Sequence, residues 1–83
     1  MSRLPLSGLP VGAAGHVATV LLEPREVGWL CAVGISEGTH VTLLRRAPFG
    51  GPVHLRTGSG AEFAVDRELA GAVMVEPGSE HVP

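Results

Sequence analysis

The sequence predicts a small, mostly-β domain of about five short strands, with one short α-helix after the first strand and a short helical turn before the last. The chain has 83 residues, which suits one compact domain. Its 12 glycines and 7 prolines favour short strands joined by tight turns. Several segments alternate apolar and polar residues, which is typical of half-buried strands. Because closing a small sheet removes its exposed edges, we expect a β-barrel.

The N-terminal segment, residues 4–12, is apolar and interrupted by prolines and glycines. Proline cannot donate to a sheet ladder, so this segment is predicted to be an arm that covers one end of the barrel rather than a central strand. Residues 15–22 are β-branched or apolar and form the first predicted strand.

Residues 24–33 carry the signals of a helix. Pro24 suits a first helical position, Glu26 suits the positive end of the helix dipole, and Gly34 suits the position after the last turn. Val27, Leu30 and Cys31 share one face at helical spacing, which predicts that this face is buried.

The second half of the chain is predicted to be a meander of hairpins. Phe49, Gly50 and Gly51 join two strand-like runs, and the glycines at 58 and 60 mark another turn. Asp66 is predicted to cap the helical turn. The predicted strands are residues 39–47, 52–57, 61–65 and 72–76, and the turn is residues 67–70. We expect residues 1–77 to form the domain and residues 78–83 to be a flexible C-terminal tail.

Composition restricts the function. The net charge is −2 and all six basic residues are arginines, so nucleic-acid binding, which relies on phosphate contacts, is not expected. No apolar run approaches the roughly 18 residues of a membrane span, and the N-terminus lacks a signal peptide. Cys31 is a single cysteine and cannot form an internal disulfide. We therefore expect a reduced, cytoplasmic protein without direct membrane insertion.

The sequence contains no pattern typical of an active site. It shows no nucleophile with a matching base, no carboxylate dyad and no cofactor motif, so we expect no enzymatic activity and no cofactor. The four histidines match no zinc spacing, and we assign no metal site. The segment around Gly50 is glycine-rich, but it lacks the lysine and the following helix of a phosphate loop.

Five residues are candidates for contact with a protein partner: Arg25, Trp29, Arg45, Arg46 and Phe49. The helical wheel places Trp29 opposite the core face, and tryptophan is enriched at interface hot spots. Packing of Trp29 over a neighbouring loop is the competing interpretation. Phe49 lies at a predicted hairpin tip, either tucked in or presented to a partner. Arg45 and Arg46, followed by Arg56, form a small positive patch or are simply solvated strand charges.

Six motifs, taken in order, resemble the FeoA family, ferrous iron transport protein A. They include a Leu-Ser-x-Leu-x-x-Gly arm and an Ala-Pro-Phe-Gly-Gly-Pro turn, where the family shows Ala-Pro-Leu-Gly-Asp-Pro. The six motifs are residues 6–12, 15–17, 30–35, 36–41, 47–53 and 69–75. The family is usually basic just before the Leu-Leu pair of the helix, where this chain has Gly28 and Trp29, and Cys31 replaces the second leucine.

The resemblance implies an SH3-like barrel and a role in bacterial ferrous iron uptake. The partner would be the cytoplasmic part of a FeoB-type membrane GTPase that transports iron, which the chain would modulate. Two alternatives stay open: an RNA- or ribosome-associated SH3-like module, and a regulatory domain that binds a transition metal. A homodimer through Trp29 or through unpaired strand edges is also open.

Overall fold

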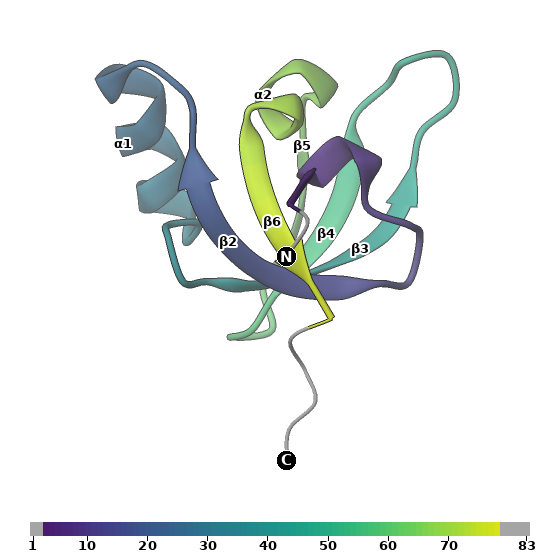
Figure 1. Ribbon diagram of the computed structural model, residues 1–83. Coiled ribbons are helices and arrows are strands. Elements are labelled where there is room, and N and C mark those ends of the chain that lie inside the picture. The colour runs from purple at the N-terminus through teal and green to yellow at the C-terminus, as the bar shows by residue number, and fades with distance from the viewer. Residues whose placement is uncertain (1–2, 79–83) are drawn as a thin grey trace.

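The computed structural model describes residues 3–78, with the side chains of Trp29, Cys31 and Val33 excepted. In chain order the elements are β1(Leu4–Pro5), the 3-10 turn η1(Leu6–Gly8), β2(Ala14–Val20), α1(Pro24–Val33), β3(His40–Arg46), β4(Val53–Thr57), β5(Glu62–Val65), α2(Arg67–Gly71) and β6(Val73–Pro77). The strands form one strongly curved sheet, and both helices lie toward the same end of it (Figure 1). Nearly all of the predicted tail, residues 79–83, lies outside the described residues.

The sheet has six strands in the order β1-β6-β2-β3-β4-β5, and every pairing is antiparallel. The prediction of about five strands missed β1, in which Leu4 pairs with Val75 and Pro5 with Met74. Pro5 is tolerated there because β1 is an edge strand with a free side. The two edge strands of this order, β1 and β5, are not paired with each other, so the predicted closure into a barrel is not observed.

The core follows the two-residue period of the strands. Its members are apolar side chains with at most 2% exposure, drawn from every strand from β2 to β6, from η1 and from both helices. Leu6 and Leu9 come from the arm, so the arm covers the core as predicted. In β5, Val65 is buried and Phe63 half-buried, whereas Glu62 and Ala64 are exposed, as their alternation predicts.

The helix begins and ends where the sequence predicts, at Pro24 and Val33. Leu30 is fully buried and Val27 half-buried, whereas Arg25 and Gly28 on the opposite face are exposed. Asp66 occupies the N-cap position of α2, but its side chain makes no capping hydrogen bond, so that detail of the prediction is wrong. The Asp66 backbone carbonyl instead accepts the amide of Ala70 at 2.9 Å.

Candidate functional site

The loop between β3 and β4 contains a tight turn with an unusual residue in it. Gly51 N donates to the Pro48 carbonyl at 3.1 Å, and the two residues between them have positive φ angles, 59° at Phe49 and 73° at Gly50. Positive φ at both central positions is the requirement of a type I′ turn, which strongly prefers Asn-Gly. Phe49 is the non-glycine residue with a positive φ among the described residues. An aromatic residue is therefore held where a small polar one would be favoured.

Phe49 is also fully exposed, at 103% of the reference accessibility. It stands at the tip of the loop that rises beside β3 and β4 at the right of the molecule (Figure 1). Of the two alternatives that the sequence left open, the structure shows Phe49 presented to solvent rather than tucked in.

Arg67, at the start of α2, holds the base of this loop. Its Nε donates to the Gly51 carbonyl at 3.0 Å, and its Nη2 donates to the Ala47 carbonyl at 2.9 Å. A further hydrogen bond closes the loop, from Ala47 N to the Pro52 carbonyl at 2.9 Å. Pro48 and Pro52 restrict the loop further because their rings fix φ. The backbone is also close at the base, where a Cβ on Gly51 would lie 2.8 Å from that of Ala47. The tip is thus fixed on a rigid base.

The two arginines of β3 have different environments. Arg46 is half-buried, and its guanidinium donates to the carbonyls of Ser7 at 3.0 Å and of Leu9, so it ties the arm to the sheet. Arg45 is exposed and makes no ion pair with any residue that the structure describes. It borders a hollow of about 210 Å³ lined by Leu44, Arg45, His54, Leu55, Glu62 and Phe63.

The five candidate contact residues do not form one patch. Arg25 is exposed on α1, at the opposite side of the molecule from the β3–β4 loop that carries Phe49 (Figure 1). Trp29 lies on the same helix as Arg25, and its side chain is outside the described residues. Phe49 and Arg45 therefore belong to the β3–β4 hairpin, and Arg25 and Trp29 belong to helix α1.

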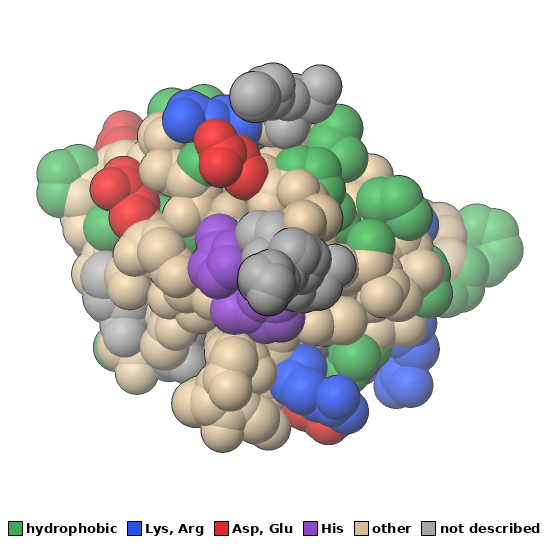
Figure 2. Space-filling view, turned by 60° about the horizontal axis from the view of Figure 1, so that its bottom comes forward, with side chains coloured by type: hydrophobic (Ala, Val, Ile, Leu, Met, Phe, Trp, Pro, Cys, Tyr) green, Lys and Arg blue, Asp and Glu red, His purple; other side chains and the backbone are tan. Residues whose placement is uncertain are grey.

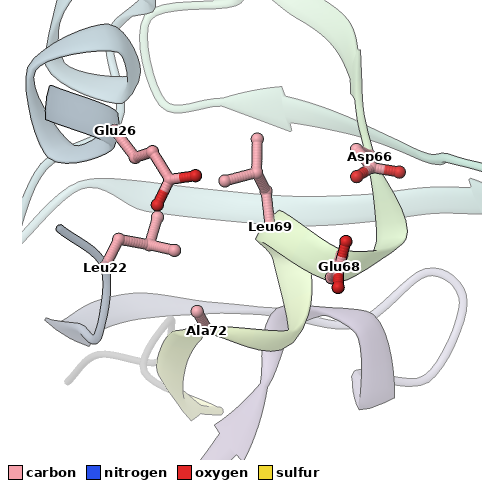
Figure 3. A pocket seen from close by; sticks show the side chains of 6 residues that line it. All are labelled: Leu22, Glu26, Asp66, Glu68, Leu69 and Ala72. Atoms are coloured by element: carbon pink, nitrogen blue, oxygen red, sulfur yellow. The ribbon is translucent and has the colours of Figure 1, made fainter.

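A cleft of about 510 Å³ separates α1 from α2 (Figure 3). Apolar side chains of Leu22, Leu69 and Ala72 line it together with the carboxylates of Glu26, Asp66 and Glu68. Glu26 points into the cleft from α1, and Asp66 and Glu68 lie on the opposite side (Figure 3). In the described part of the chain none of these three carboxylates has an ion pair.

Two histidines lie side by side on adjacent strands. His16 of β2 pairs with His40 of β3, and their rings meet edge to face with centroids 5.2 Å apart. Histidine side chains accordingly gather at the centre of the face that Figure 2 shows. Metal sites usually take three or four protein ligands. Within residues 3–78, as far as their side chains are described, no group of three or more His, Cys, Asp or Glu could hold a metal ion.

Phe49 and Arg45 are candidate contact residues that the sequence itself indicates, whereas the role of Arg67 in holding the loop is seen only in the fold. The hydrogen bonds of Arg67 reach 16 and 20 residues back along the chain, and no local pattern signals such a contact. The acidic cleft was missed for the same reason, because its residues come from two helices far apart in sequence.

Neither helix in the described part of the chain has the length and hydropathy that crossing a bilayer requires.

Comparison with known proteins gives one consistent result. A family model described as FeoA domain matches residues 4–77, which include every element from β1 to β6. A crystal structure of an iron uptake regulatory protein (FeoA) is similar with a TM-score of 0.81 and 31% identity, covering 93% of this chain and 99% of that one. Comparison with curated proteins gives no match.

Two further solved structures carry the FeoA name. The FeoA protein of Chlorobium tepidum is similar with a TM-score of 0.80 and 27% identity, covering 89% of this chain and 70% of that one. The FeoA of Stenotrophomonas maltophilia, an SH3 domain protein determined in complex with zinc, gives a TM-score of 0.69 and 25% identity, covering 86% and 87%. These similarities agree with an SH3-like fold for this chain.

Proposed function

The chain belongs to the FeoA family, and on that premise we propose that it is an accessory protein of ferrous iron uptake that binds the cytoplasmic part of a FeoB-type GTPase transporter. The observation that carries the proposal is the family match over residues 4–77. The chain would work at the cytoplasmic face of the membrane and would act by binding, without catalysing a reaction itself.

Two surfaces are available for this contact. One is the β3–β4 hairpin with exposed Phe49 and Arg45. The other is helix α1 with exposed Arg25, where the helical spacing of the sequence predicts Trp29 on the same face. Arg46 would contribute indirectly, because its guanidinium already binds the arm. Aromatic and arginine side chains are the residue types that carry most binding energy at interfaces.

The test is a binding measurement with the FeoB-type transporter of the same genome, purified and reconstituted in nanodiscs. The immobilised chain should bind these nanodiscs saturably, and empty nanodiscs should not bind. The GTPase rate of the transporter, measured with and without the chain, shows whether binding modulates it. Absence of saturable binding to the transporter would overturn the proposal.

The matched variants separate the two surfaces. Arg25→Ala and Arg45→Ala each remove one exposed cation, and Leu21→Ala removes an exposed apolar side chain, 64% accessible, from neither surface. Rim charges act mainly on the association rate, so the variant on the docking surface should slow association and flatten its dependence on salt. Leu21→Ala should bind like the unchanged chain.

A further inference from the structure

We propose that Phe49 is a preorganised aromatic anchor, which inserts its ring into an apolar, acid-rimmed pocket of the protein partner, and that Arg67 is the residue that positions it. This inference rests on the proposed function and adds to it the mode of recognition.

Phe49 does nothing for the stability of the free chain. Its side chain is fully exposed, so it buries no apolar area. Its φ is 59°, a backbone conformation that bulky residues rarely adopt. Such strained conformations persist only where the surrounding structure imposes them, and they cluster at functional sites. Asparagine at the same position would suit the turn better. The free protein is therefore less stable with phenylalanine at this position than it would be with asparagine. This loss of stability indicates that Phe49 acts in a complex with a partner.

The base of the loop supplies what an anchor needs. Arg67 binds both sides of the base, at the Ala47 and Gly51 carbonyls, and the Ala47–Pro52 hydrogen bond closes it. A loop held in its bound shape loses little conformational entropy on binding, which increases affinity. Arg67 touches only the loop backbone among the contacts described, so its effect on a partner passes through the position of Phe49.

The surroundings of the tip indicate the chemistry of the partner. Residues 45–52 contain two arginines and no acidic residue, and Arg45 is the exposed one. Since potentials across an interface are complementary, the rim of the receiving pocket should be acidic. One exposed aromatic ring and one exposed arginine on the same hairpin, on a chain with a net charge of −2, are a weak match for an anionic membrane surface. A protein pocket is the better fit.

The chain offers a direct reporter of insertion. It contains two phenylalanines, Phe49 and Phe63, so labelling with 4-fluorophenylalanine gives two fluorine NMR signals. Phe63 is half-buried on β5 and lines the hollow beside Arg45, so its signal shows whether the contact extends from the tip to that hollow. When transporter nanodiscs are added, the Phe49 signal should shift and lose its sensitivity to exchange of H₂O for D₂O, and it should change more than the Phe63 signal.

Phe49→Asn is the matched variant, because asparagine favours this turn. It should raise the urea midpoint of the free chain and weaken transporter binding about tenfold or more. In the chain that keeps Phe49, Arg67→Ala should weaken transporter binding. In the Phe49→Asn variant, the same Arg67→Ala change should not weaken binding any further. If Arg67 only stabilised the fold, it would weaken binding equally in both chains.

The outcomes are distinguishable. If the unchanged chain does not bind the transporter, the proposed function fails and the anchor fails with it. If the chain binds but Phe49→Asn binds equally well, the anchor alone is overturned. A Phe49 signal that changes with empty anionic nanodiscs, or with concentration of the chain by itself, assigns the tip to a membrane or to a second copy and likewise overturns it.

Discussion

The absence of a side chain at single glycine positions decides how closely two backbones can approach each other. Gly15 is buried in β2 beside β6, and a Cβ there would lie 2.7 Å from Val75 Cγ1 and 2.9 Å from Pro77 Cα, with the Glu76 carbonyl oxygen closer still. Gly28 on the outer face of α1 has nothing within 4 Å of the same atom. The two glycines therefore predict opposite effects of one added methyl group.

Gly15→Ala should lower the free energy of unfolding by about 2 kcal/mol or more, because the obstacle is mostly backbone that cannot move aside. Gly28→Ala should raise it by roughly 0.5–1 kcal/mol, the difference in helix propensity. Urea denaturation of both variants checks the pair. Equal effects at the two positions would show that β2 and β6 are not packed as closely as described.

The two neighbouring arginines of β3 give a second pair. Arg46→Ala removes two charged hydrogen bonds from half-buried carbonyls of the arm and should cost about 2 kcal/mol of unfolding free energy. Arg45→Ala should change it by less than about 0.5 kcal/mol, because Arg45 is exposed and forms no ion pair with described residues. Thermal denaturation compares them, and a large loss for Arg45→Ala would contradict the assignment of Arg46 as the residue that holds the arm.

Helix α1 lies at the periphery of the fold. It stands at one side of the sheet (Figure 1), with Leu30 as its fully buried side chain among those described. The cleft of Figure 3 lies on one side of it, and a hollow of about 350 Å³ lined by Val20, Val27, Ile35, Ser36 and Glu37 lies along it. The helix is therefore expected to open at a lower free-energy cost than the central strands β2, β3 and β4.

Native-state hydrogen exchange should show this difference. Amides of α1 should exchange through openings that cost less free energy than global unfolding, whereas those of β2, β3 and β4 should exchange only with global unfolding. Leu30→Ala should increase the exchange of α1 more than that of the strands. Uniform protection of helix and strands would show that α1 belongs to the same cooperative unit as the sheet.

At the scale of the whole molecule, the sequence predicted what depends on neighbouring residues. The bounds of α1 and the β3–β4 hairpin follow from prolines, glycines and short periodicities. Long-range contacts were not predictable in this way. They include the pairing of β1 with β6, the open order of the sheet, and the reach of Arg46 and Arg67 to carbonyls far back in the chain.

The same limit applies to the candidate site. Phe49 was identified as a hairpin-tip residue, but its exposure depends on the β3–β4 loop standing clear of the sheet and on its base being held by α2. The three-dimensional path of the loop decides whether an aromatic side chain at a turn packs against the protein or points into solvent. A local sequence pattern does not predict that path. Grouping the candidates into a hairpin pair and a helix pair also needed the fold.

The pairing of β1 with β6 brings the two ends of the described domain together. Leu4 lies opposite Val75, and Arg3 Nε forms an ion pair with Glu76 Oε2 at 3.3 Å, so the chain enters and leaves the fold at one place. A short linker between the two strands, with new ends in the exposed Gly58–Gly60 turn, should give a circular permutant with the same NMR fingerprint, whereas a cut inside β3 should prevent folding. One entrance shared by both ends lets such a fold be added to, or inserted into, a longer protein without disturbing its sheet.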